Sequence, residues 1–144
     1  MNISKSFTLD ELTTTNVRQH DNTPGPIEIE NLRRLCERVL EPLVKKYPSA
    51  IITSAYRSLA VNTAIGGSKT SQHMHGNAVD IVVPRVSPLL VAEWAVANVE
   101  DFDQVICEWS WTHIGLCDGK PRGQKMTAKR GPDGKAVYSM GFNP

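Results

Sequence analysis

The stretch SQHMHGNAVD, residues 71–80, decides how this 144-residue chain folds. It begins with polar residues typical of a loop, passes through Gly76, and enters an apolar, β-rich run from Ala78 to Val83. Successive side chains of a strand point to opposite faces, so Asp80 points away from the face that its apolar neighbours share. The pattern therefore predicts His73 on a loop and Asp80 within a strand.

The Asp80 carboxylate is costly to bury in an apolar strand unless a cation or hydrogen bonds compensate for it. Together with the His73 imidazole it offers ligand atoms that suit Zn²⁺. A catalytic zinc site needs a third protein ligand and an open position for water. WTHIG, residues 111–115, predicts a short strand with His113 on one face. We therefore predict one Zn²⁺ ion held by His73, Asp80 and His113.

The motif Ser-x-His-x-x-Gly-x-Ala-x-Asp, followed later by Trp-x-His, resembles the zinc D-Ala-D-Ala carboxypeptidase family of peptidoglycan peptidases. This family includes phage endolysins that cut the L-alanyl-D-glutamate bond, and it shares its fold with the hedgehog signalling domain. The five fixed positions of the first motif are Ser71, His73, Gly76, Ala78 and Asp80. TSAYRS, residues 53–58, and FTLDEL, residues 7–12, also resemble family segments. The similarity spans Phe7 to Leu116.

We expect a single domain over residues 1–144, with a core at about 7–117 and a C-terminal hairpin tail at 118–144. The expected class is α+β: a small, mainly antiparallel sheet carries the site on one face, and helices pack on the other, as in hedgehog/DD-peptidase-like proteins. Helices are predicted over residues 27–47, 59–65 and 89–99, and strands over 50–55, 78–83, 102–108 and 111–115. Pro42 should kink or end the first helix near Leu40. In the last helix, Leu90, Trp94 and Ala97 form a stripe expected to be buried.

Three further residues are candidates for binding the substrate. The position of Arg57 alone is more often that of a surface ion pair, but the resemblance implies that Arg57 binds substrate and stabilises the oxyanion of the transition state. Ser71 either hydrogen-bonds the substrate or a ligand, or only caps its loop. Trp111 either lines the cleft or packs beside His113. We expect His75 to face the cleft or solvent, outside the ligand set.

A zinc peptidase also needs a carboxylate that takes a proton from water and passes it to the leaving amine. Many members of the family place this acid three residues before the last His ligand, and here that position is Ser110, which cannot act as such a base. Glu108 is the nearest carboxylate, and we predict it as the general base and acid. An Asp elsewhere in the chain and an inactive site stay open.

Composition limits the partners. A formal net charge of +1 gives no reason to expect nucleic acid or a membrane surface as a partner. Three cysteines do not make a disulfide framework, and Cys36 and Cys107 are predicted to be reduced core residues. The N-terminus lacks the apolar region of a secretory signal, and no segment is long enough to span a bilayer. We expect a monomer made in the cytoplasm that acts on the cell wall if it is released or exported, as phage proteins are.

The resulting hypothesis is a zinc-dependent peptidase that hydrolyses peptidoglycan stem peptides containing D-amino acids. It is either a D-Ala-D-Ala carboxypeptidase or an endolysin-type endopeptidase. An open-ended cleft would favour the endopeptidase, and a basic group closing the cleft would favour the carboxypeptidase. The alternative is a non-catalytic, zinc-bearing module that binds the cell wall or belongs to a phage structure, because a fold does not fix a function.

Overall fold

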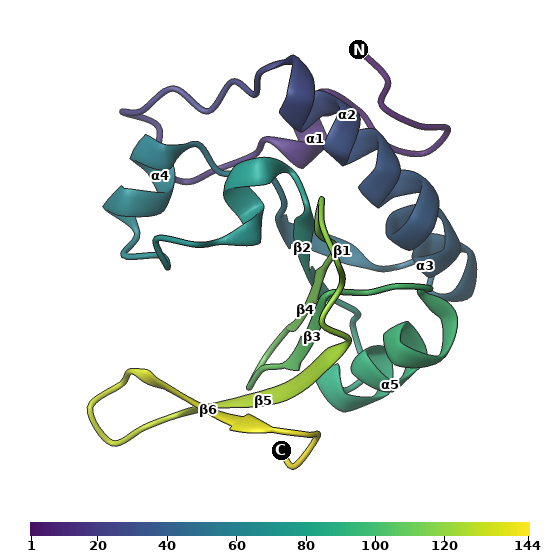
Figure 1. The fold of residues 1–144 in the computed structure, drawn as a ribbon, viewed down its shortest axis with the longest axis vertical. Helices are drawn as coiled ribbons and strands as arrows, with labels where there is room; N and C mark the ends of the chain where they lie inside the picture. The colour runs from purple at the N-terminus through teal and green to yellow at the C-terminus, as the bar shows by residue number, and fades with distance from the viewer.

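A computed structural model describes residues 1–144, and a six-stranded sheet lies at its centre (Figure 1). The strand order is β1-β2-β4-β3-β5-β6. The strands are β1 (Ile51–Ser54), β2 (Ala78–Val82), β3 (Gln104–Cys107), β4 (Thr112–Gly115), β5 (Gln124–Arg130) and β6 (Ala136–Met140). The helices are α1 (Leu9–Leu12), α2 (Pro26–Leu35), the π-helix η1 (Cys36–Leu40), α3 (Glu41–Lys46), α4 (Leu59–Ala64), the 3₁₀-helix η2 (Gln72–His75) and α5 (Pro88–Asn98). The α+β class is as predicted.

The sheet is mixed, which corrects the expectation of a mainly antiparallel sheet. β3 and β5 pair in parallel, while their other neighbours pair antiparallel. The reason lies in the connection after β4, which ends at Gly115 opposite Gln104 at the start of β3. Residues 116–123 then cross that end of β3, and β5 begins at Gln124, again opposite Gln104. Because β5 starts at the same end of β3, the two strands run in the same direction.

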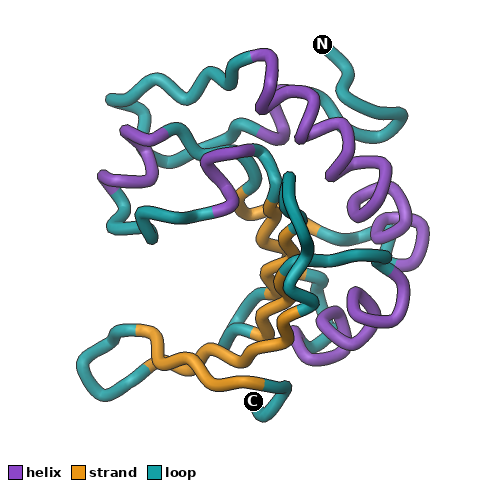
Figure 2. The backbone as a smooth tube through the Cα atoms, viewed as in Figure 1, coloured by secondary structure: helices purple, strands orange, loops and turns teal.

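Helices cover one face of the sheet and leave the other for the site. Three helices, α2, α3 and α5, lie along one side of the sheet. On the other side, α4 and the β5–β6 hairpin project away from the sheet (Figures 1 and 2). The strand residues that enter the hydrophobic core are Val79, Ile81, Val105, Cys107 and Ile114. Since side chains alternate along a strand, Asp80, Ile106 and His113 lie on the opposite face.

The helix predicted over residues 27–47 forms as two α-helical segments, α2 and α3, and the π-helix between them ends at Leu40, where a kink or an end was expected. Pro42 has no N–H and cannot make the usual helical hydrogen bond. Directly before it, the N–H of Glu41 donates to the carbonyl of Cys36, one residue further back than in an α-helix. This wider turn is η1, and it joins α2 to α3 in place of a break.

Helix α5 buries a different stripe from the one predicted. Leu90 is 54% exposed and Ala97 is exposed, so of the predicted stripe only Trp94 packs, half-buried, against the core. The buried residues are Val91, Ala92 and Ala95. The helix is apolar almost all round, so its sequence does not define which side meets the core. Cys36 and Cys107 are free and buried, as expected.

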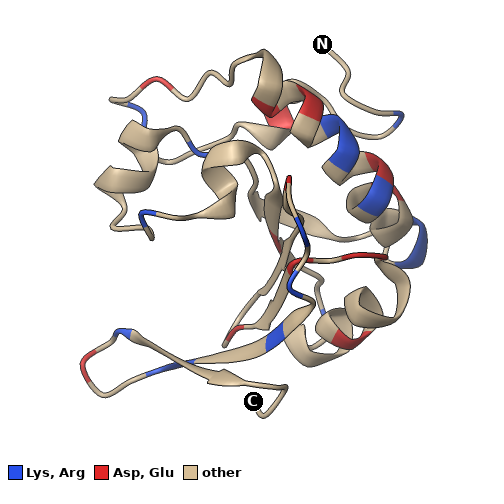
Figure 3. Ribbon diagram, viewed as in Figure 1, with Lys and Arg blue, Asp and Glu red and all other residues tan.

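Charged side chains of both signs are interspersed over the helical layer (Figure 3). Arg33, for example, pairs with Glu30 one turn earlier on α2 at 3.3 Å. This mixture agrees with the small formal net charge. None of the helices combines the length and the apolar character needed to cross a membrane.

Gly76 allows the loop of residues 71–77 to lie against α2. Gly76 ends η2 with a φ of +73°, and a Cβ at this position would lie 2.6 Å from the main-chain oxygen of Glu28 on α2. Gly66 has nearly the same φ, +72°, but nothing lies within 4 Å of a Cβ there. Only Gly76 therefore combines a left-handed backbone with close contact to another main chain.

We predict that Gly76→Ala destabilises the protein by about 1–3 kcal/mol more than Gly66→Ala. In both variants the alanine is destabilised by the left-handed backbone, and only in Gly76→Ala does the new Cβ also collide with α2. Urea unfolding of the two variants beside the wild type measures the difference. Equal losses would show that the loop is not held against α2 at this point.

Candidate metal centre and active site

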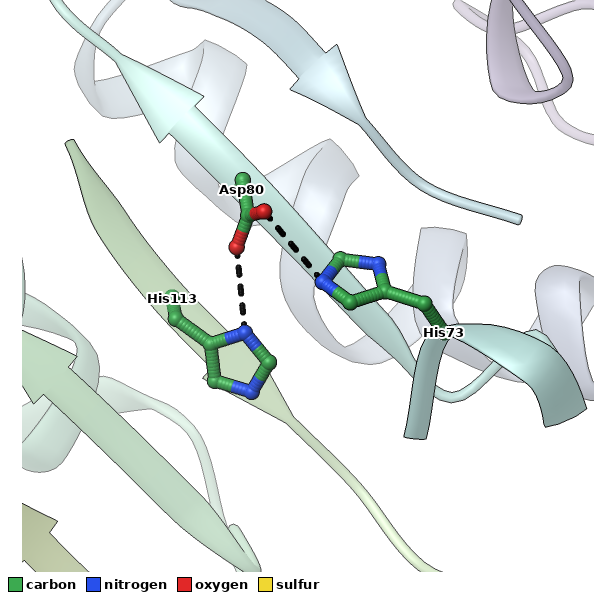
Figure 4. Close-up of side chains that lie close together, drawn as sticks. All are labelled: His73, Asp80 and His113. Carbon is green, nitrogen blue, oxygen red and sulfur yellow. Dashed lines mark hydrogen bonds and ion pairs between the residues drawn. The ribbon is translucent and has the colours of Figure 1, made fainter. Parts of the chain in front are cut away.

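The three predicted ligands meet at one point on the free face of the sheet (Figure 4). Asp80 on β2 lies directly opposite His113 on β4, and η2 brings His73 beside them. One ligand atom from each residue lies within 4.8 Å of the others. Three residues from separate elements thus come together as the motifs predict.

The Asp80 carboxylate bridges the two imidazoles. Its Oδ1 lies 3.0 Å from His113 Nδ1, and its Oδ2 lies 3.3 Å from His73 Nε2. Burial alone would raise the pKa of Asp80, but the charges and hydrogen bonds of the two histidines hold it well below its usual range. Burial also lowers the pKa of His73. Asp80 is therefore ionised and His73 neutral at pH 7, as metal ligands must be.

The protein fixes the orientation of His73. Its Nδ1 lies 2.6 Å from the carbonyl oxygen of Ala55, which can only accept a hydrogen bond, so Nδ1 carries the proton. Its Nε2 lone pair then points toward Asp80. The His73 main chain is held as well, because its N–H donates to Ser71 Oγ and its carbonyl accepts from the N–H of Arg57. A buried imidazole whose second nitrogen donates to a carbonyl is typical of a metal ligand.

The donor set fits Zn²⁺. Two imidazole nitrogens and one carboxylate oxygen match the three protein ligands of a catalytic zinc site, which leaves one position for water or substrate. That position faces a cavity of about 570 Å³. The cavity is lined by all the residues predicted for the site: His73, Asp80, His113, Arg57, Ser71, Glu108 and Trp111. The arrangement suits a metal that works on a bound substrate more than a closed structural site.

Arg57 is half-buried at the end of the segment that follows β1 and makes no ion pair. Its Nη2 donates to Ser71 Oγ at 3.2 Å, so Ser71 both caps η2 and holds the guanidinium. Burial lowers the pKa of Arg57, while the charges of Asp80 and Glu108 raise it. A cation without an acidic partner at the edge of the cavity is available to a carbonyl or carboxylate of a substrate.

Glu108 lies at the end of β3, and its main-chain N–H donates to the carbonyl of Trp111. Only 9% of the residue is exposed. Burial and the nearby charge of Asp80 raise the pKa of Glu108 to about 7. Ser110, which occupies the usual position of the acid, is exposed and does not line the cavity. Of these two positions, only Glu108 offers a proton acceptor inside the cavity.

One wall of the cavity, built by β3, the crossing loop and the β5–β6 hairpin, was not predicted from the sequence. That wall consists of Gln104, Ile106, Arg122, Met126 and Tyr138. Ile106 lies between His113 and Met126 in adjacent register positions of the sheet, so all three share a face. The only available signal was the alternation along β3, because the sequence does not say to which edge of the sheet the hairpin is added.

We predict that Glu108→Gln stabilises the metal-free protein at pH 8 but not at pH 4. At pH 4, Glu108 is largely protonated in both the folded and the unfolded protein, so its burial lowers the free energy of unfolding only slightly. Between pH 4.5 and about 7, the unfolded chain loses this proton while the folded protein keeps it, so stability falls. Above pH 7 the full cost is present, about 3 kcal/mol for this pKa difference. Urea unfolding of both proteins at the two pH values measures it, and a gain that does not depend on pH would contradict the raised pKa.

Comparison with known proteins agrees with this site. No curated protein sequence matches the chain. A protein-family model described as Peptidase M15 matches residues 5–115, which include the three clustered candidate ligands, Arg57 and Glu108. The match ends at Gly115, before the crossing loop and the hairpin. The chain therefore belongs to the peptidase M15 family of zinc D-Ala-D-Ala carboxypeptidases and endopeptidases.

Proposed function

We propose that this protein is a zinc-dependent peptidase that hydrolyses peptidoglycan stem peptides containing D-amino acids. The proposal rests on the position of Glu108, a buried carboxylate that lines the same cavity as His73, Asp80 and His113 and whose pKa in the metal-free protein is raised to about 7. A general base works best when its pKa is close to the working pH. A module that only binds the cell wall has no use for such a group.

Each residue has a distinct part in the proposed reaction. His73, Asp80 and His113 would hold one Zn²⁺ ion, which when bound makes water acidic and polarises the scissile carbonyl. Glu108 takes the proton from the attacking water and returns it to the leaving amine. Arg57 holds a carbonyl or carboxylate of the substrate and offsets the developing negative charge on the oxygen. Ser71 keeps Arg57 in place, and Trp111 forms part of the wall against which the peptide lies.

The shape of the cavity supports an endopeptidase. From the ligands it continues past Ile106 to Met126 and Tyr138 on the hairpin. The cation on this side, Arg122, is paired with Asp103 at 2.7 Å, and the unpaired Arg57 follows β1 at the opposite edge of the sheet, so the hairpin side of the cavity offers no unpaired lining cation to a substrate carboxyl terminus. A carboxypeptidase needs such a counter-ion where the cleft ends. We therefore propose cleavage within a longer stem peptide.

We predict that Glu108→Gln lowers kcat on purified peptidoglycan by about 10²–10⁴-fold while zinc stays bound, because the variant loses only the proton acceptor. Mass spectrometry of the released peptides follows the reaction and identifies the bond that is cut.

The matched control is Ser110→Ala, which removes the hydroxyl at the usual position of the acid. Because Ser110 lies outside the cavity, this variant should hydrolyse peptidoglycan like the wild type. The proposal fails if the zinc-loaded wild type is inert, and the assignment of the base fails if Glu108→Gln keeps its activity.

A further inference from the structure

The second nitrogen of His113 is engaged on the side of the ring away from Asp80. While Nδ1 faces the Asp80 carboxylate, Nε2 lies 3.0 Å from Oε1 of Gln72. Gln72 immediately precedes His73 and belongs to the same 3₁₀-helix, η2. One short element thus supplies a ligand and also contacts the ring of a second ligand on another strand.

The neighbours of Gln72 determine which way its side-chain amide points. Its Nε2 lies 2.5 Å from Asp103 Oδ2 and 3.1 Å from the carbonyl oxygen of Leu116. Both partners accept hydrogen bonds, so a flipped amide would place its oxygen against two acceptor oxygens. Oε1 therefore faces His113. Because Oε1 can only accept, it stabilises a proton on Nε2 when a metal occupies the Nδ1 lone pair, whereas without the metal the Asp80 carboxylate competes for the ring proton at Nδ1.

We propose that Gln72 is a positioning residue that holds His113 as the Nε2-protonated imidazole and so presents its Nδ1 lone pair to the metal. The inference rests on the proposed metal site, but it does not depend on which substrate is cut. Partners that accept the second N–H of a ligating histidine set its tautomer and ring orientation, and their loss typically weakens metal binding 10–100-fold. His73 receives the same support from the Ala55 carbonyl, whereas His113 depends on a side chain.

An ion pair between the buried Asp103 and the exposed Arg122 holds Gln72 in turn. Asp103 is 4% exposed, and its Oδ1 accepts the main-chain N–H of Arg122 at 2.9 Å. Its Oδ2 accepts from Nη2 of Arg122 at 2.7 Å as well as from Gln72. Arg122 belongs to the crossing loop of residues 116–123, beyond the part of the chain that matches the family model. The loop that makes the sheet mixed therefore also supports the metal centre.

Gly115 provides the space for this contact. A Cβ on Gly115 would lie 2.0 Å from Gln72 Oε1 and 2.6 Å from its Cδ. The residue has no positive φ, so the absence of a side chain matters for room and not for backbone conformation. A larger residue at this position would push the Gln72 amide away from His113 without removing any polar group from the chain.

The test is zinc affinity, measured by competition with a chromophoric chelator on the full chain. Gln72→Leu keeps the approximate shape of the side chain but removes the acceptor, and it should weaken zinc binding 10–100-fold. Gly115→Ala should have an effect in the same direction by pushing the amide aside. The matched control is Gln124→Leu, which removes an amide from β5 outside the cavity and should bind zinc like the wild type.

A spectroscopic readout separates positioning from a general loss of structure. In zinc-loaded, ¹⁵N-labelled wild type, the His113 ring should show a slowly exchanging proton on Nε2 and a metal-bound Nδ1. Gln72→Leu should speed the exchange of that proton, and urea unfolding of the metal-free variants checks that they remain folded.

Zinc affinity within twofold of the wild type in Gln72→Leu, or an unchanged exchange rate of the Nε2 proton, would overturn the proposal. Failure of the proposed function looks different. If the wild type binds zinc but does not cut peptidoglycan, the proposed peptidase function is wrong. Weaker zinc binding by Gln72→Leu would still support the role of Gln72.

Discussion

The Asp80 carboxylate, whose side chain is only 15% exposed, is the constraint on which the rest of the structure depends. It lies in a strand whose Val79 and Ile81 side chains enter the hydrophobic core from the other face, and burial alone would disfavour its charge. Two imidazoles compensate for it, one from the opposite strand and one from a loop that must fold back over the sheet. The pairing of β2 with β4, the turn at Gly76 and the anchoring of η2 all serve to bring these two rings to the carboxylate.

The two histidines around that carboxylate are supported by different kinds of contact, which form two halves of the site. Main-chain groups hold His73. The Ala55 carbonyl accepts a hydrogen bond from the His73 ring, and the main-chain N–H of Arg57 donates to the His73 carbonyl. Side chains hold His113, through Gln72 and the ion pair of Asp103 with Arg122. The first half lies within the region shared with the family, and the second reaches into the crossing loop beyond it. The additional strands therefore form part of the site's support as well as the far wall of its cavity.

Much of the site could be predicted from the sequence because its residues follow local rules. Alternation along two short strands placed Asp80 and His113 on one face, and a loop-like motif placed His73 beside them. The direction of β5 and the buried stripe of α5 could not be predicted in the same way. The first depends on which edge of the sheet the crossing loop reaches, and the second concerns a helix that is apolar almost all round. Gln72 was missed because its contacts with His113 and Asp103 join residues more than 30 positions apart.

The most direct test of the account is the zinc stoichiometry and affinity of the wild type beside Asp80→Asn. Asparagine keeps the shape of the side chain but removes the charge that binds the ion and pairs with both histidines. The wild type should bind one zinc ion per chain tightly, and Asp80→Asn should lose that binding. His75→Ala, which removes an exposed histidine near the motif, should bind zinc like the wild type. A wild type that binds no zinc, or an Asp80→Asn variant that binds it equally well, would contradict the account.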